Sequence, residues 1–274
     1  MSMNNNTDKR STISTTNDGR LELTFIGSGS AFGKKYYQNN LLAVKGPDHL
    51  LIDCGTRAPE ALAALGLSVQ DVNTYVITHS HADHVGGLEE VMLLNRYVGK
   101  RKCVMVAPAK YRQALWEKSL KGGAAYNERI GGRNLRFSDF WDIIDPVEIP
   151  NADRELCECS VGGIELAMFR TMHIPDSVPS WRESNYSYAV VIDKSVLFTS
   201  DTRYDPQLIE FAFSRYPITA IFHDCQLYTG GVHASLEELA GLDPAVRAIT
   251  RLMHYGDGLS DEHHKRATEL GFVG

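Results

Sequence analysis

The sequence HSHADH at residues 79–84 constrains the fold and the chemistry of this chain more than any other segment. It holds four potential metal ligands within six residues, directly after an apolar stretch that is typical of a strand. Such a group of polar side chains would be costly to bury together without a metal ion. Since a loop can turn side chains toward one point, we expect His79 and His81 to reach one ion and Asp83 and His84 a second. Imidazole and carboxylate ligands suit Zn²⁺, with Mn²⁺ or Fe²⁺ as alternatives.

Three further potential ligands, His173, Asp201 and His254, each follow an apolar stretch that we expect to form a strand. Strand ends and the loops after them are where sheet proteins place their functional sites. A lone histidine or aspartate is most often structural or merely exposed, so none of the three would indicate a site alone. Together with the motif, they predict that several strand ends contribute ligands to the same place.

The order of the expected elements favours an α/β fold in a single domain over residues 20–274. Apolar patterns predict strands at residues 21–26, 188–192 and 196–200, and helices at residues 88–94 and 245–251. This order suggests two sheets with helices outside them. Residues 110–150 look irregular and contain two Gly-Gly pairs, and we expect them to form a lid-like insertion near the active site. Residues 1–19 are polar, which predicts a disordered tail.

The composition narrows the classes of partner. The formal net charge is −6, which disfavours nucleic acid without excluding a small anionic substrate held by a metal pair. The five scattered cysteines indicate no disulfide framework. No stretch is apolar enough to span a membrane, and the first residues have no apolar run like that of an export signal. We therefore expect a cytoplasmic protein with no membrane partner.

These motifs resemble the metallo-β-lactamase superfamily over residues 21–258. The resemblance rests on DCG at residues 53–55, the HSHADH motif, His173, SDT at residues 200–202, and His254. It implies an αββα sandwich with a dinuclear zinc site along one edge, and hydrolysis by a hydroxide that bridges the metals. By this resemblance one zinc would be bound by His79, His81 and His173, and the other by Asp83, His84 and His254, with Asp201 as the bridging ligand.

Two further motifs, FHDC at residues 222–225 and GVHAS at residues 231–235, are similar to elements of the tRNA 3′-end endonuclease family RNase Z. That family uses the second histidine as an acid on the leaving group, which implies a catalytic role for His233. Asp83 would help to orient the nucleophile, and Asp224 would orient His233. His223 is better explained as a buried strand histidine or a group behind the metal ligands. The acidic charge balance and the lack of a basic Gly/Pro-rich arm are departures from RNase Z.

The combination is most similar to the anti-Pycsar phosphodiesterases, which are RNase Z-like enzymes that cleave cyclic nucleotide signals. The sequence YYQNNL at residues 36–41 adds to that resemblance. It implies a zinc phosphodiesterase that acts on cyclic nucleotides or small nucleotide phosphodiesters. It also suggests a homodimer, in which residues 110–150 act on their own site or on the neighbour's. A tRNA 3′-end endoribonuclease, a lactone or thioester hydrolase, and a metal-binding sensor remain as alternatives.

Overall fold

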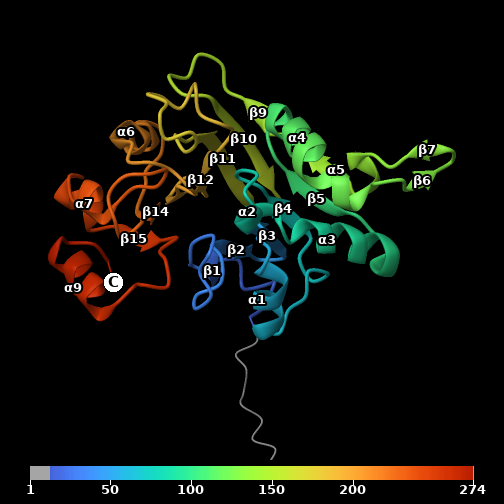
Figure 1. Cartoon of the computed structure of the whole chain (residues 1–274), viewed down its shortest axis with the longest axis horizontal. Coiled ribbons are helices and arrows are strands. Elements are labelled where there is room, and N and C mark those ends of the chain that lie inside the picture. Colours follow the sequence, from blue (N-terminus) through green and yellow to red (C-terminus); the bar gives the residue numbers. More distant parts are fainter. Residues whose placement is uncertain (1–12, 274) are drawn as a thin grey trace, which may run out of the picture.

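Two sheets face each other, with helices on their outer surfaces, in a computed structural model that describes residues 13–273 (Figure 1). The first sheet has six strands in the order β1 (Glu22–Gly27), β2 (Asn40–Lys45), β3 (Asp48–Ile52), β4 (Thr74–Val76), β5 (Cys103–Val106) and β8 (Trp141–Ile144). Its strands β1 to β3 are antiparallel, and β3, β4, β5 and β8 run parallel. This is the predicted αββα arrangement.

The second sheet has seven strands and supplies the other half of the sandwich. Their order is β15 (Thr250–Met253), β14 (Ala220–Asp224), β13 (Val196–Phe198), β12 (Tyr188–Ile192), β11 (Ile164–Arg170), β10 (Leu156–Val161) and β9 (Val147–Glu148). The three strands β13, β14 and β15 are parallel, and the rest of the sheet is antiparallel. The carboxyl ends of β13, β14 and β15 therefore meet at one edge.

The helices cover the outer faces of both sheets. The longer ones are α1 (Ala58–Ala64), α3 (Leu88–Leu94), α4 (Ala109–Leu115), α6 (Pro206–Arg215) and α9 (Asp261–Glu269). The short ones are α2 (Ala82–Val85), α5 (Lys121–Ala124), α7 (Leu236–Leu239) and α8 (Pro244–Arg247), with irregular helical turns η1 (Asn95–Gly99), η2 (Trp116–Leu120) and η3 (Phe137–Asp139). None of the helices in the described part of the chain is long and apolar enough to cross a bilayer.

Strand β12 shows how the sequence builds this layering. All five of its residues are buried, because successive side chains point to opposite faces of the sheet and both faces are covered. Tyr188 and Val190 pack into the core between the sheets, and Ala189 and Val191 pack into a second core under α6. The sequence of β12 is therefore apolar throughout, because each of its faces packs against an apolar layer.

Residues 245–251 were expected to be helical, but α8 ends at Arg247 and β15 begins at Thr250. The expectation holds for residues 245–247 and is wrong for residues 250 and 251, because parallel pairing with β14, which places Thr250 opposite Ile221, outweighs the local preference. The predicted tail at residues 1–19 lies mostly outside the described residues, and within its described part Asn17 N donates to Gly46 O at 2.9 Å.

Residues 110–150 are more regular than expected. They contain most of α4, which buries Tyr111 and Leu115 four residues apart on one face, and β8, which completes the first sheet. Between them a short hairpin of β6 (Arg129–Ile130) and β7 (Arg133–Asn134) projects from the body of the protein (Figure 1). Its turn uses Gly131 and Gly132, both with positive φ.

Candidate metal centre

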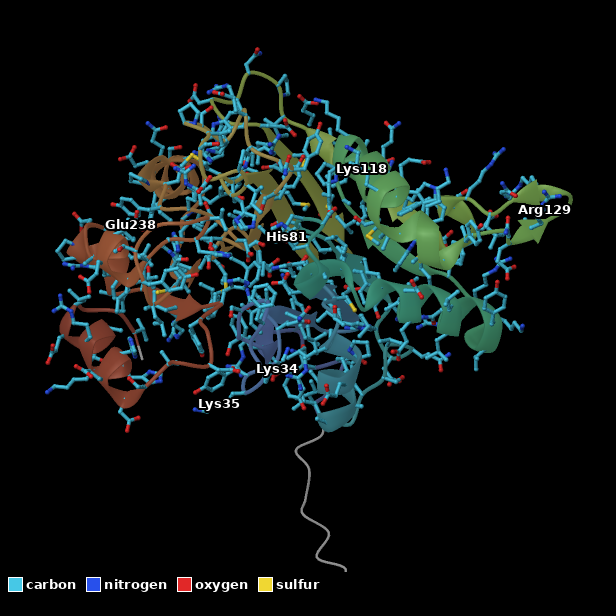
Figure 2. The ribbon with its side chains drawn as sticks, in the orientation of Figure 1. Lys34, Lys35, His81, Lys118, Arg129 and Glu238 are labelled. Carbon is cyan, nitrogen blue, oxygen red and sulfur yellow. The ribbon has the colours of Figure 1, made fainter. Side chains whose placement is uncertain are left out.

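The predicted ligands converge because each follows the end of a strand. The HSHADH segment leaves β4, so that His81 precedes α2 and Asp83 and His84 lie in its first turn. His173, Asp201 and His254 come shortly after β11, β13 and β15. Figure 2 shows His81 near the middle of the molecule, between the two sheets.

The backbone at these strand ends is strained. Asp53, Ser200 and His254 have φ values of 62°, 51° and 63°, in the left-handed region that residues other than glycine seldom adopt. Each such residue costs ~1–3 kcal/mol, and strain of this kind concentrates at functional sites. The fold therefore tolerates strain here to direct particular side chains.

The first cluster joins His79, His81, His173 and Asp201, whose ligand atoms all lie within 4.8 Å of one another. His81 Nδ1 is 3.1 Å from His79 Nε2 and 3.2 Å from His173 Nε2. His173 Nδ1 donates to the Val232 carbonyl at 2.9 Å, so the neutral ring presents an Nε2 lone pair to the cluster. Imidazole nitrogens that face one another at this spacing suit a shared cation.

The second cluster joins Asp83, His84, Asp201 and His254, and all four are buried. His254 Nε2 is 3.3 Å from Asp83 Oδ2, and His84 Nε2 is 3.3 Å from Asp201 Oδ1. Buried polar atoms nearly always have a hydrogen-bond partner, yet among the described residues His84 Nε2 and Asp201 Oδ1 have none. A metal ion between these atoms would satisfy both, so the residues present fit the group that the sequence implies.

Further buried groups hold the ligands in place. His84 Nδ1 donates to Asp53 Oδ2 at 2.7 Å, and Asp53 also accepts from the Thr78 amide and hydroxyl at 2.9 and 2.7 Å. Carboxylates that bind the second nitrogen of a metal-binding histidine fix its tautomer and orientation. Sequence reasoning placed Asp53 in a family motif but gave it no role, because its partner lies 31 residues away.

A histidine and aspartate pair stands beside the two clusters. His233 Nδ1 donates to Asp224 Oδ2 at 2.8 Å, which is the contact expected if Asp224 orients His233. Asp224 is fully buried, accepts from the Thr202 amide at 2.9 Å, and has Oδ1 3.3 Å from His254 Nδ1. His233 keeps 20% of its side chain exposed, so its other nitrogen can face a substrate.

His223 does not join this group. It is 1% exposed, and its Nδ1 donates to the Asp224 carbonyl at 2.8 Å. The geometry agrees with a buried strand histidine behind the site. It lies in none of the described clusters that could hold a metal ion.

The electrostatics divide the site into neutral and charged groups. Burial lowers the pKa of His79, and it lowers the pKa of His173 to about 4. Burial also opposes charge on His254, but Asp201 and Asp224 outweigh it and raise its pKa to about 10. Burial disfavours the Asp201 carboxylate too, yet His254 and His84 hold its pKa well below the usual range. The Asp201 carboxylate is therefore ionised and available to bind a cation.

The two-sheet fold with this cluster at its strand ends defines the metallo-β-lactamase fold, and solved structures agree. The metallo-β-lactamase fold protein YhfI from Bacillus subtilis matches with a TM-score of 0.65 at 18% identity, over 93% of this chain and 94% of its own. A diphosphatase of the PhnP family has a TM-score of 0.62 at 17% identity, over 90% and 91% of the two chains. The short form of human tRNase Z, ELAC1, matches with a TM-score of 0.58 at 15% identity, over 87% of this chain and 93% of its own. Identities this low show the fold alone.

Sequence relatives narrow the class. The family described as anti-Pycsar protein Apyc1 matches residues 21–274. An anti-Pycsar protein Apyc1 from Bacillus phage 010DV004 is 38% identical over 256 residues, which cover 88% of this chain and 91% of the relative. An anti-Pycsar protein Apyc1 from Paenibacillus harenae is 34% identical over 254 residues, which cover 92% of this chain and 97% of the relative. This chain belongs to the anti-Pycsar Apyc1 family, which confirms the resemblance drawn from its motifs.

Proposed function

We propose that this protein is a phosphodiesterase with a dinuclear metal site, and that it hydrolyses cyclic nucleotides or small nucleotide phosphodiesters. The observation that supports two metals is the position of Asp201, which belongs to both ligand clusters. Its carboxylate lies 3.7 Å from His79 Nε2 and 3.3 Å from His84 Nε2. Membership of the anti-Pycsar family supports a nucleotide substrate.

The proposed ligands divide as the two clusters do. One ion would be held by His79, His81 and His173, the other by Asp83, His84 and His254, and Asp201 would bridge them. Zn²⁺ suits these nitrogen and oxygen ligands, with Mn²⁺ or Fe²⁺ as alternatives. Two such ions would supply an activated water molecule near neutral pH and neutralise charge on the phosphate oxygens.

The chain itself supplies the proton for the leaving group. His233 Nδ1 is occupied by Asp224, so its Nε2 is free to hold a proton toward the substrate. Burial opposes charge on His233, but Asp224 outweighs this and raises the pKa of the imidazole. A positioned acid of this kind typically contributes ~10²–10⁴-fold to the rate. Asp83 would act as a ligand and also help to orient the attacking water.

A hydrolysis panel on metal-replete protein tests this function. We expect turnover of cyclic mononucleotides and none of unprocessed tRNA or lactones, with Asp201→Ala as the control that ties activity to the site. Turnover of tRNA alone would identify an RNase Z-like endonuclease. Turnover of lactones or thioesters alone would identify a carbonyl hydrolase, and inactivity on every substrate would favour a metal-binding sensor.

We also propose that the protein is a homodimer in which the β6–β7 hairpin serves the neighbouring subunit. In Figure 2 Arg129 lies at the outer end of this hairpin, well away from His81 of its own chain. The hairpin region exposes Tyr126 at 76% and Ile130 at 45%, which suits a contact with another surface. Light scattering should show a dimer, and a monomer at all working concentrations would exclude the shared site.

A further inference from the structure

A cavity with a volume of about 460 Å³ opens beside His81 and His173. We call it the Arg170 cavity. Its wall includes Tyr111, Lys118, Arg170, Arg182, Asn185 and Tyr186. Small-molecule sites span ~300–1,000 Å³, so the cavity can hold one mononucleotide but no folded RNA.

The charge of the Arg170 cavity is unusual for this chain. Lys118, Arg170 and Arg182 line it, and none of the described lining residues is Asp or Glu, although the chain has a net charge of −6. Lys118 makes no ion pair with any residue in the described part of the chain. Arg170 is paired with Glu155 at 3.7 Å, so among the described residues Lys118 and Arg182 are the cations of the lining without an ion pair, and they favour an anionic ligand.

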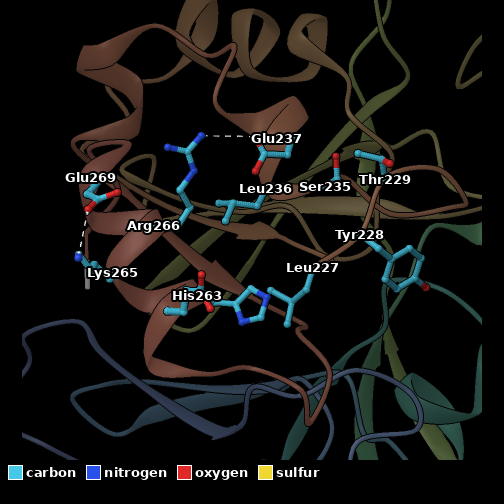
Figure 3. A pocket seen from close by; sticks show the side chains of 11 residues that line it. Leu227, Tyr228, Thr229, Ser235, Leu236, Glu237, His263, Lys265, Arg266 and Glu269 are labelled. Atoms are coloured by element: carbon cyan, nitrogen blue, oxygen red, sulfur yellow. Dashed lines mark ion pairs between the residues drawn. The ribbon is translucent and has the colours of Figure 1, made fainter.

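A second cavity, between α7 and α9, provides a contrast (Figure 3). It has a volume of 350 Å³, and its lining mixes three glutamates with Lys265 and Arg266. Arg266 pairs with Glu237 at 3.6 Å, and Lys265 pairs with Glu269 at 3.9 Å. An excess of cations is thus a property of the cavity beside the metal ligands and is not shared by this one.

An aromatic platform forms one wall of the Arg170 cavity. The rings of Tyr186 and Tyr188 are parallel within 3°, with centroids 6.4 Å apart. The Arg170 guanidinium carbon lies 4.7 Å from the Tyr186 centroid and 5.8 Å from that of Tyr188. Tyr188 is fully buried, whereas Tyr186 is half-buried and lines the cavity. Tyr186 therefore ends a rigid stack and presents an aromatic surface to a ligand.

Arg170 makes this platform rigid. It is 5% exposed and donates to the carbonyls of Trp181 at 3.1 Å, Ser184 at 2.7 Å and Asn185 at 3.2 Å. Ser184 Oγ in turn accepts from the His173 amide at 3.0 Å. The loop that carries Tyr186 is thus tied to a proposed metal ligand before any substrate binds.

We propose that the Arg170 cavity binds the nucleoside part of the substrate, with the base stacked on Tyr186 and the phosphate directed toward His81 and His173. This proposal rests on the proposed function. Stacking on an aromatic side chain accepts any of the bases, because every base has a π face. Lys118 and Asn185, both exposed at the mouth, supply charge and polar contacts.

The test compares Tyr186→Leu, Tyr186→Phe and Tyr97→Leu with the wild type. Tyr97 is a tyrosine that is 43% exposed and does not line the cavity, so it is a matched control. Calorimetry on metal-replete protein measures binding of adenosine 5′-monophosphate and of inorganic phosphate, with metal content checked for each variant. We expect Tyr186→Leu to weaken nucleotide binding by at least ~10-fold while phosphate binding and metal content stay unchanged. Tyr186→Phe, which keeps the ring, should stay within ~2-fold, as should Tyr97→Leu.

The outcomes separate this proposal from the proposed function. If Tyr186→Leu binds the nucleotide as the wild type does, or if phosphate and nucleotide affinities fall together, the cavity assignment is wrong. If the wild type hydrolyses no phosphodiester but its nucleotide binding depends on Tyr186, the proposed function fails and the cavity assignment stands. If cyclic nucleotides are hydrolysed and their KM is unchanged in Tyr186→Leu, the proposed function stands and the cavity assignment fails.

Discussion

Replacement of His233 by alanine tests whether this side chain protonates the leaving group. Its Nδ1 is 2.8 Å from Asp224 Oδ2, and the fully buried Asp224 raises the pKa of the imidazole despite burial. The protonated form is therefore available near neutral pH. A ribose oxygen is a poor leaving group and needs that proton, whereas a nitrophenolate leaves readily as an anion.

The expected loss follows from the size of general acid catalysis. His233→Ala should lower kcat for a cyclic nucleotide by ~10²–10⁴-fold, which corresponds to ~2.7–5.5 kcal/mol of transition-state stabilisation. A nitrophenyl phosphodiester should slow by less than ~10-fold, because its leaving group needs no acid. Steady-state kinetics on both substrates, with elemental analysis of each variant, measures this difference. His264→Ala, which changes an exposed histidine on α9, is the matched control.

Two results would refute this assignment. Equal slowing on both substrates with the metals retained would mean that His233 binds phosphate and that the acid lies elsewhere, with His223 the next candidate. Loss of metal would mean that His233 is itself a ligand. Asp201, Asp224, His233 and His254 do form a third cluster that could hold an ion, so the assignment of His254 would then need revision.

Three further predictions concern the metals, the pH dependence and the charge of the cavity. Elemental analysis should find about two ions per chain, and Asp201→Ala should lose more metal and activity than any other ligand change; a variant that keeps both ions would contradict the bridge. Since Asp224 raises the pKa of His233, activity on a cyclic nucleotide should fall as pH rises through that pKa, and Asp224→Asn should move this fall to lower pH with a ~10–100-fold loss of rate; an unmoved profile would exclude His233 as the titrating acid. Lys118→Glu should lower kcat/KM for a cyclic nucleotide by ~3–10-fold at low salt and much less at high salt; a loss that is independent of salt would show that Lys118 does not act through long-range charge.

Some elements could be predicted from local pattern alone. The helix expected at residues 88–94 is α3, and the strands expected at residues 21–26 and 188–192 are β1 and β12, because their apolar periodicity matches the faces that they bury. Helix α6 was missed despite a readable start, in which Asp205 caps the Leu208 amide and Pro206 occupies the first turn. For residues 249–253 the local pattern gave two conflicting expectations, a strand before His254 and a helix over residues 245–251, and only pairing with β14 decides that β15 forms over Thr250–Met253.

The HSHADH motif by itself indicated that this chain gathers potential metal ligands, since burying four such side chains from six residues together without a metal ion would be costly. The tertiary structure alone decided which groups surround them. It brought Asp53 to His84 and joined Asp224 to both His233 and His254. It also placed Arg170 behind the half-buried ring of Tyr186. These contacts depend on burial and hydrogen bonding between strands far apart in the chain, and a local sequence pattern contains no record of them.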